Sequence, residues 1–373
     1  MKLTFCAPCI FGLEGYCANE FRFLGLENVR AENGRVLFDG DFAAMARANI
    51  NARYAERIQI LLAEFRATTF EQLFEGVRRI RWADYIGMSD AFPVKGSCLS
   101  SQLMSVPDCQ RIIKKAVAAS LSGRYMLSWF EETGAVHQIQ FLIMNNRVSI
   151  LLDTSGAGLH KRGYRAQSNE APIKETLAAA MAELAGVRPG HFVIDPMCGS
   201  GTILIEAAMK ALKIAPGLNR WFASEKWSCV PDGVFEEERE RARAAVNRDC
   251  AFHAEGYDID PDALATARHN AEKAGVADCI SFARRDIRDF VLPGGYCTVV
   301  TNPPYGERLL DLNAAEELYK IMGEQFAREK GKRYAVITPD DDFEKLFGRK
   351  ADKRRKTYNG TLKCQIYLFT SYT

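Results

Sequence analysis

From about residue 170 onward, short apolar runs alternate with segments whose apolar residues recur every three or four positions. Strands joined by helices in this way predict an α/β fold, a mostly parallel sheet with helices on both faces and ligands at the carboxyl ends of the strands. A loop rich in Trp and a highly charged helix at 236–247 interrupt the alternation. Strands are expected at 192–195, 254–258, 280–283, 298–301, 333–338 and 363–370, and helices at 203–212, 261–274 and 314–328.

A helix is also expected just before the first of these strands. Ile173, Leu177, Met181 and Leu184 have the spacing of one helix face. A polar cap with a proline in the first turn is typical of helix starts, because the missing proline N–H has no partner there in any case. The expected cap is Ser168 or Asn169, and the expected proline in the first turn is Pro172.

Residues 1–160 have a different pattern, in which short strands and helices are interleaved without a Gly-rich phosphate loop. This favours small α+β units. A hairpin is expected at the Asn145-Asn146 turn. Predicted strands cover 2–6, 35–39, 57–65, 137–145 and 147–153, and predicted helices cover 15–24, 42–51, 69–79 and 108–120.

The composition narrows the class of protein. At 373 residues the chain has room for two or three domains. Hydrophobic residues at 47% and charged residues at 26% are typical of globular proteins and exclude a disordered or fibrous chain. The net charge of +2 excludes a histone-like polycation, although a local basic face can still bind nucleic acid.

The cysteines and the N-terminal residues indicate a reducing, cytoplasmic setting. The eleven cysteines are odd in number and scattered, unlike a disulfide framework. Cys6 and Cys9 form one C-x-x-C pair near Cys17, but structural zinc usually takes two such pairs, so we expect buried thiols and no metal. No apolar run is long enough to cross a bilayer, and Glu14 follows the start too closely for a signal peptide.

The first predicted strand of the α/β part ends in the turn Asp195-Pro-Met-Cys-Gly-Ser-Gly-Thr202. Glycines in such a turn allow a ligand to approach the backbone, and the N–H groups of the following helix point to the same place. The nicotinamide fingerprint is absent because Leu204 stands where its third glycine would be. A turn that serves packing alone is the other interpretation of this feature.

Acids also follow the next two strands. Asp258 ends the second predicted strand, in Gly256-Tyr-Asp-Ile-Asp260, and Asp286 follows the third. A carboxylate at the end of the second strand can hold ribose hydroxyls. Each acid alone could be a solvated loop residue, but three acids at three successive strand ends favour a nucleoside-binding edge.

The motif after the fourth strand is the most informative, Thr301-Asn-Pro-Pro-Tyr-Gly-Glu-Arg-Leu309. Two prolines fix the backbone and leave carbonyls without competing N–H donors. Asn302 offers a side-chain carbonyl and Tyr305 a flat ring, which suits an exocyclic amino group on a nucleobase. The alternative is a structured Asn-Pro turn.

These two motifs resemble those of amino-directed, S-adenosylmethionine-dependent methyltransferases. More narrowly, Leu159–Arg165, Ala171–Thr176, Asn219–Phe222 and Tyr358–Gly360 resemble the RlmL family of bacterial THUMP-containing 23S rRNA guanine-N2 methyltransferases, in its short form with a single methyltransferase domain. The resemblance covers nearly the whole chain. It implies a ferredoxin-like domain at 1–54, a THUMP RNA-binding domain at 55–160 and a Rossmann-like methyltransferase domain at 165–373.

The resemblance also implies site residues, with S-adenosylmethionine as cofactor and RNA, most simply rRNA, as partner. Catalysis is expected at Asn302, Pro303, Pro304 and Tyr305. Cofactor binding is expected at Asp195, Pro196, Cys198, Gly199, Gly201, Thr202, Asp258, Ile259, Asp286, Ile287 and Asn302.

Three basic stretches are candidates for phosphate contact. Arg78–Arg81 is most simply a solvated face. His160–Arg165 joins two predicted domains, and 348–356 holds six Lys or Arg among nine residues, which favours nucleic-acid contact. The expected RNA-binding residues are His160, Lys161, Arg162, Arg165, Arg354, Arg355 and Lys356.

Several functions compete with guanine-N2 methylation in 23S rRNA. A tRNA guanine-N2 methyltransferase is the nearest, and an adenine-N6 or cytosine-N4 DNA methyltransferase would use the same Asn-Pro-Pro-Tyr tetrad. A non-catalytic RNA-binding factor is disfavoured because both motifs are intact. The glycine pattern disfavours a nicotinamide oxidoreductase.

Overall fold

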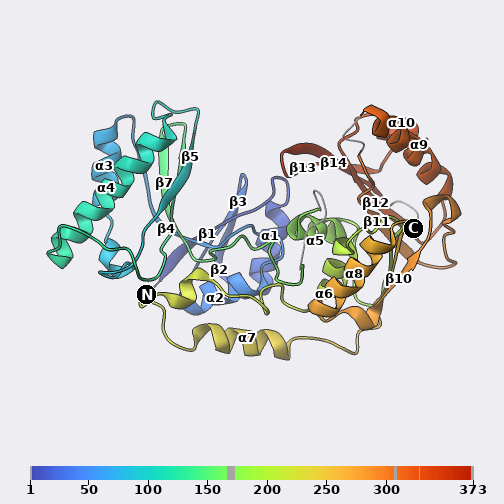
Figure 1. Ribbon diagram of the computed structural model, residues 1–373, viewed down its shortest axis with the longest axis horizontal. Helices are drawn as coiled ribbons and strands as arrows, with labels where there is room; N and C mark the ends of the chain where they lie inside the picture. Colours follow the sequence, from blue (N-terminus) through green and yellow to red (C-terminus); the bar gives the residue numbers. More distant parts are fainter. Residues whose placement is uncertain (1, 166–172, 306–308, 327, 371–373) are drawn as a thin grey trace. The chain divides into compact units, whose positions relative to one another are not determined.

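The computed structural model describes residues 2–165, 173–305, 309–326 and 328–370 (Figure 1). The chain forms two compact units, and two segments belong to a different unit from the one that their position in the sequence suggests. Residues 220–241 lie in the first unit, although they fall within 165–373, the segment predicted to form the methyltransferase domain. Residues 10–13 lie in the second unit, although they fall within 1–54, the segment predicted to be ferredoxin-like. The first unit contains Met1–Cys9, Glu14–Leu159 and Arg220–Arg241, and the second contains Ile10–Leu13, His160–Asn219 and Ala242–Thr373.

In the described part of the first unit, seven strands form one sheet in the order β2-β3-β1-β4-β7-β6-β5. Only the β5–β6 pair is parallel. Pairing of β1 with β4, which sets Phe5 opposite Ile60, joins the segments predicted as ferredoxin-like and THUMP domains into one continuous sheet. The strands are β1 (Leu3–Pro8), β2 (Glu27–Glu32), β3 (Arg35–Gly40), β4 (Gln59–Arg66), β5 (Val94–Leu99), β6 (Ile139–Met144) and β7 (Arg147–Asp153).

The helices of this unit begin at polar caps. Asp41, Thr69 and Ser105 each accept a hydrogen bond from the backbone N–H three residues on, which satisfies one of the free donors at a helix start. The helices are α1 (Glu14–Phe23), α2 (Phe42–Asn51), α3 (Phe70–Arg78) and α4 (Val106–Tyr125), and α7 (Val234–Ala244) begins in this unit.

Two strands of this sheet, β2 and β5, have no counterpart in the sequence prediction. They are the two edge strands of the sheet. Every residue of β2 is exposed or half-buried, and so is every residue of β5. An edge strand with little buried surface has no reason to alternate apolar and polar residues, so its pattern carries no strand signal.

The second unit contains the α/β fold that the alternation predicts. Its sheet has the order β10-β9-β8-β11-β12-β14-β13 in the described residues. The first five strands are parallel and β14 is antiparallel to both of its neighbours. The strands are β8 (Phe192–Asp195), β9 (His253–Asp258), β10 (Ile280–Arg284), β11 (Cys297–Thr301), β12 (Lys332–Thr338), β13 (Lys353–Asn359) and β14 (Leu362–Phe369).

Helices cover both faces of this sheet, as predicted. One face packs on α9 and α10, where Tyr319 and Phe343 join Val299, Tyr334 and Tyr367 in a single core cluster. On the other face α6 contacts β8 and β9, and α6 and α8 pack together (Figure 1). The helices are α5 (Glu175–Leu184), α6 (Thr202–Ala211), α8 (Pro261–Ala274), α9 (Leu309–Gln325) and α10 (Phe343–Leu346).

Two local predictions differ from the structure. Helix α5 begins at Glu175 with Lys174 as its N-cap, and the predicted caps and proline (Ser168, Asn169 and Pro172) lie outside the described residues. The basic run, for which no strand was predicted, forms the edge strand β13. None of the described helices is long and apolar enough to cross a membrane.

Candidate active site

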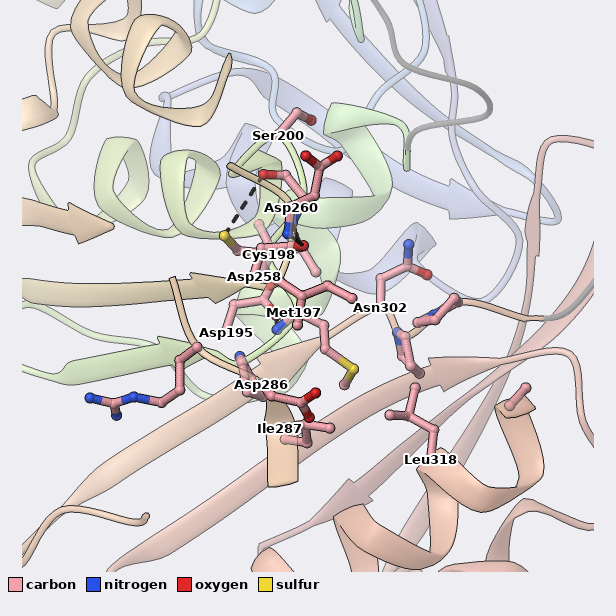
Figure 2. A pocket seen from close by; sticks show the side chains of 18 of the residues that line it. Asp195, Met197, Cys198, Ser200, Asp258, Asp260, Asp286, Ile287, Asn302 and Leu318 are labelled. Atoms are coloured by element: carbon pink, nitrogen blue, oxygen red, sulfur yellow. Dashed lines mark hydrogen bonds between the residues drawn. The ribbon is translucent and has the colours of Figure 1, made fainter. Parts of the chain in front are cut away.

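A cavity of about 820 Å³ opens at the carboxyl ends of β8, β9 and β11 (Figure 2). It brings together residues from six separate stretches of the second unit. All four predicted catalytic residues line it, and so do the predicted cofactor residues except Gly201. The lining residues that the sequence singled out are Asp195, Pro196, Cys198, Gly199, Thr202, Asp258, Ile259, Asp286, Ile287, Asn302, Pro303, Pro304 and Tyr305.

The two glycines of the turn after β8 serve different purposes. Both have left-handed backbone, with φ of +51° at Gly199 and +77° at Gly201. A Cβ on Gly199 would meet no atom within 4 Å, so this backbone is open to a ligand. A Cβ on Gly201 would lie 3.1 Å from Ala267 Cβ and from the Phe282 ring. Gly201 therefore allows the start of α6 to pack closely on α8 and β10. It is not among the residues that line the cavity, and its contact with the cofactor stays a prediction.

Asp258 connects two of the loops that form the cavity. Its Oδ2 accepts a hydrogen bond from the Gly199 N–H at 2.9 Å, and its Oδ1 accepts one from the Asp260 N–H at 3.0 Å. A carboxylate has about four lone-pair positions, so Asp258 can still accept hydrogen bonds from hydroxyl groups of a ligand. Ile259, which follows it, is 60% exposed and offers an apolar surface beside this acceptor.

Asp195 differs from Asp258 because it is buried. Only 1% of its surface is exposed, and its Oδ1 accepts a hydrogen bond from the Met197 N–H at 3.1 Å. Burial raises the pKa of Asp195 to about 7, since the ionised form loses its hydration and the nearby Asp258 carboxylate also opposes ionisation. The end of β8 therefore carries an acid whose charge changes near neutral pH.

Asp286 caps the short helical turn after β10. Its carboxylate accepts hydrogen bonds from the backbone N–H and the guanidinium of Arg288, both at 2.9 Å. Arg288 and Arg285 line the same cavity, and the Arg285 guanidinium lies 4.1 Å from the centroid of the Tyr257 ring. This part of the cavity combines a partly neutralised acid with the buried side chain of Ile287.

The Asn-Pro-Pro-Tyr motif follows β11 and forms the other side of the cavity. The Tyr305 hydroxyl donates a hydrogen bond to the Asn302 side-chain carbonyl. Burial raises the pKa of Tyr305, so the phenol stays protonated and can donate this bond. Pro303 is buried and Pro304 is exposed, and this pair fixes the backbone between the two polar side chains.

Some lining residues were not predicted. Met197 and Ser200 lie within the turn that the sequence singled out, so their neighbours could have indicated them. Ile173 lies well before the first motif and Leu318 well after the last one, so no local sequence pattern indicates them. The other unpredicted lining residues are Ile203, Asp260, Arg285, Arg288, Ala314 and Ala315.

The first group of predicted RNA-binding residues is only partly on the surface. Lys161 is exposed and His160 is half-buried. Arg162 is buried, and its guanidinium lies 3.4 Å from Glu206. Arg165 donates hydrogen bonds to the Thr202 hydroxyl and to the Ile173 carbonyl. Polar partners within the second unit therefore hold both guanidinium groups, and RNA contact at Arg162 and Arg165 stays a prediction.

The second group lies on β13. Arg355 and Lys356 are exposed. Arg354 donates to both carboxylate oxygens of Glu344, and its guanidinium lies 5.8 Å from the centroid of the Tyr367 ring. Arg354 is therefore already engaged by the protein, which leaves its two neighbours as the better candidates for phosphate contact.

The cysteine residues offer no further centre. Cys6, Cys9 and Cys17 are buried in the first unit, and Cys198 is buried beside the cavity. Among the described residues, no group of three or more His, Cys, Asp or Glu side chains is arranged to hold a metal ion.

Comparison with known families assigns a domain type to most of the chain. Residues 162–367 match the RMKL-like methyltransferase domain, residues 4–59 match the RlmL ferredoxin-like domain, and residues 67–153 match the THUMP domain. The three domain types and their order are those implied by the sequence motifs.

Two curated relatives are similar over almost all of this chain. "Putative RNA methyltransferase YpsC" of Bacillus subtilis is 42% identical, with 99% of this chain and 96% of the relative covered. "Ribosomal RNA large subunit methyltransferase K/L" of Cellvibrio japonicus is 32% identical over 98% of this chain. The chain spans about half the length of that second relative, at 51%.

Solved structures also match the whole chain. The structure titled "SMU.472, a putative methyltransferase complexed with SAH" has a TM-score of 0.91 and 40% identity, covering 99% of this chain and 98% of the other. A "predicted N6-adenine-specific DNA methylase" from Listeria monocytogenes has a TM-score of 0.93 and 42% identity, covering 99% and 96%. At this similarity, a relative with bound SAH supports S-adenosylmethionine as the cofactor.

Proposed function

This chain belongs to the RlmK/L-type family of S-adenosylmethionine-dependent RNA methyltransferases, and from that premise we propose that it methylates the 2-amino group of a guanine in 23S rRNA. The observation that carries the proposal is the position of Asn302 and Tyr305. They lie at the carboxyl end of β11, on the cavity whose other side carries the acids of β8, β9 and the turn after β10.

The residues around the cavity suit S-adenosylmethionine. Gly199 leaves its backbone open where the cofactor would lie, and Asp258 retains acceptor capacity for ribose hydroxyls. Ile259 and Ile287 offer apolar surface for the adenine, with Asp286 beside them. The bound cofactor supplies an electrophilic methyl group, and methyl transfer from a sulfonium depends above all on alignment.

Asn302 has the chemistry needed to prepare an amino group for methylation. The lone pair of a guanine amino nitrogen is delocalised into the ring, and acceptors for its hydrogens favour a pyramidal nitrogen. The Asn302 carbonyl has two lone pairs, so it can accept from Tyr305 and from the amino group together. The Pro303 carbonyl would accept the second hydrogen. Positioned dipoles of this kind stabilise the transition state without reorganising during the reaction.

Tyr305 would hold the base by its ring. Stacking of a base on an aromatic side chain contributes ~1–3 kcal/mol, which offsets part of the cost of flipping the base out of a helix. The hydroxyl is not needed for stacking. Its bond to Asn302 would instead keep the amide oriented toward the base.

RNA binding by the first unit would supply the substrate. The segment that matches the THUMP domain lies in this unit, and the exposed cations of β13 would add phosphate contacts in the second unit. An rRNA substrate would place the enzyme in the cytoplasm.

One other substrate class is favoured by a specific observation. The similar Listeria monocytogenes structure is titled as an adenine-specific DNA methylase, and an Asn-Pro-Pro-Tyr tetrad can serve the adenine amino group equally well. A tRNA guanine is the third candidate. The first unit favours RNA over DNA, because it contains the segment that matches the THUMP domain, which is an RNA-binding domain type.

The experiment is a direct substrate competition. Purified enzyme and radiolabelled S-adenosylmethionine are incubated with unmodified 23S rRNA, tRNA and double-stranded DNA, and the labelled nucleosides are identified by chromatography. We expect N2-methylguanosine in 23S rRNA. Label in N6-methyladenine of DNA, or in tRNA alone, would overturn the proposal. The Asn302→Ala enzyme is the control for contaminating activity.

A further inference from the structure

Trp221 is an exposed residue beside buried aromatic residues of the first unit. It is 79% exposed, whereas its neighbour Phe222 is 3% exposed and stacks on Phe235 of α7 at a centroid distance of 5.5 Å. The run Asn219–Phe222 carries part of the sequence resemblance, yet Trp221 does not line the cavity. A single exposed aromatic side chain is common on protein surfaces. What distinguishes Trp221 is the way in which the protein holds its ring.

An arginine that is itself fixed lies over one face of the Trp221 ring. The Arg239 guanidinium carbon is 5.1 Å from the ring centroid, within the range of a cation–π contact. Arg239 is only 6% exposed, and its two terminal nitrogens donate to the two carboxylate oxygens of Glu225 at 2.9 and 2.6 Å. One of these nitrogens also donates to the Arg220 carbonyl at 3.0 Å. The guanidinium therefore supports the indole from one side and leaves the other side to solvent.

The backbone around Trp221 is also fixed, against residues that belong to or directly follow the segment 67–153 that matches the THUMP domain. The Ala223 N–H donates to the Ser155 carbonyl at 3.4 Å. The Trp227 indole N–H donates to the Val136 carbonyl at 3.1 Å, within the match itself. A side chain that is already held loses little further freedom when it binds a partner, which favours binding.

The exposed face of Trp221 suits a flat partner that binds by stacking. Arg239 and Glu225 neutralise each other, so the ring attracts a partner by its aromatic surface and not by net charge. Every nucleobase has a π face and can stack on an aromatic side chain, provided that it is not already stacked inside a helix. The family acts on RNA, and the unit that carries Trp221 contains the THUMP match.

We propose that Trp221 is a stacking site for an unpaired nucleobase of the RNA substrate, outside the active site. The proposal rests on RNA as the substrate class, and not on which nucleotide is methylated. It adds to the phosphate contacts a second kind of RNA contact, which tolerates any base and is insensitive to salt.

The test compares two equally exposed tryptophans. Trp129 is also 79% exposed, but within the described ranges no cation–π or ring-stacking contact involves it. Fluorescence anisotropy measures binding of the full-length protein, without cofactor, to an unstructured single-stranded RNA oligomer. We expect about a tenfold loss of affinity for Trp221→Ala, little loss for Trp221→Phe and less than a twofold change for Trp129→Ala. The same RNA annealed into a duplex should show no dependence on Trp221.

Salt dependence distinguishes stacking from a lost phosphate contact. Trp221→Ala should leave the slope of log affinity against log salt unchanged, because no cation is removed. A lower slope, equal losses for Trp221→Ala and Trp129→Ala, or unchanged affinity for Trp221→Ala would each overturn the proposal. A protein dimer that is present in the wild type and lost in Trp221→Ala would overturn it too, because a second copy would then occupy this face.

Tryptophan emission gives an independent answer. Trp82 and Trp227 are buried, so RNA should quench mainly the exposed residues. Trp221→Phe should lose the quenching and Trp129→Phe should keep it, and the reverse result would contradict stacking at Trp221. Failure of the proposed function is distinguishable, because RNA binding would then still depend on Trp221 while no N2-methylguanosine forms.

Discussion

The two sides of the cavity are held in different ways. On the cofactor side, Asp195, Asp258 and Asp286 each accept a backbone N–H within their own or a neighbouring loop. On the acceptor side, Asn302 is held by a bond between two side chains, from the Tyr305 hydroxyl. Backbone donors are fixed by the fold, whereas a side-chain pair can separate through rotation alone.

This difference indicates a division of labour. The cofactor side is already arranged before any ligand arrives, so its residues should govern cofactor affinity and stability. Under the proposed function, the acceptor side would admit a base when the Tyr305–Asn302 pair separates, so its residues should govern turnover. The first predictions below each change one side of the cavity, and the last one changes the exposed cations of β13.

The largest effect is expected for Asn302→Ala. It removes an acceptor whose full value is realised only while the amino nitrogen attacks the methyl group, so turnover should fall about 10²–10³-fold. RNA affinity should change little, because the phosphate contacts remain. Single-turnover methylation with saturating RNA measures the rate. Tyr305→Phe should keep much of the activity and Tyr305→Ala should impair capture of the base.

A pH dependence of stability is expected from Asp195. Its pKa is raised to about 7 in the folded protein, so the folded state retains a proton that the unfolded state has released. Stability from this group is therefore present at low pH and is lost as pH rises from about 4 through 7. Between pH 5 and pH 8 the loss should be about 2.6 kcal/mol.

Denaturant unfolding at these two pH values checks this effect. Asp195→Asn has no proton to release and should remove that part of the pH dependence. A wild type and an Asp195→Asn variant with the same dependence would show that the carboxyl ionises normally. Methyl transfer is not needed for this measurement, which isolates the cofactor side.

Asp258→Ala should weaken S-adenosylmethionine binding by about 2 kcal/mol, the scale of losing hydrogen bonds to a charged acceptor. Calorimetry gives the affinity, and far-ultraviolet circular dichroism checks that the variant is folded, since Asp258 also accepts from Gly199 and Asp260. Unchanged affinity in a folded variant would remove Asp258 from the site.

The smallest effect is expected on β13, where Arg355 and Lys356 are exposed and Arg354 is already bound to Glu344. Neutralising Arg355 and Lys356 should weaken RNA binding and lower the slope of log affinity against log salt by about two. Arg354→Gln should leave that slope unchanged, because Arg354 is bound to Glu344 and packs on Tyr367. Equal slopes for the double variant and the wild type would make β13 a solvated edge.

Features that depend on nearby residues could be predicted from the sequence. Strand β8 and helix α8 begin and end where predicted, because their apolar pattern and caps are local. The acids at the strand ends meet at one cavity because parallel strands end at the same edge. Both results depend on features that lie within a few residues of each other.

Features that depend on distant partners could not be predicted. No residue next to Arg162 in the sequence marks it as buried, and its guanidinium pairs with Glu206 on α6, 44 residues further along the chain. The segment 220–241 lies within the predicted methyltransferase region, yet Arg47–Glu238 and His137–Trp227 contacts hold it in the first unit. No pattern of spacing specifies these pairings.

The most direct test of the account is the nucleoside content of cellular RNA. Mass spectrometry of 23S rRNA from a strain without this gene should show the loss of one N2-methylguanosine. Wild-type protein should restore it and Asn302→Ala should not. An unchanged N2-methylguanosine content would contradict the proposed substrate, and full restoration by Asn302→Ala would contradict the role of the acceptor side.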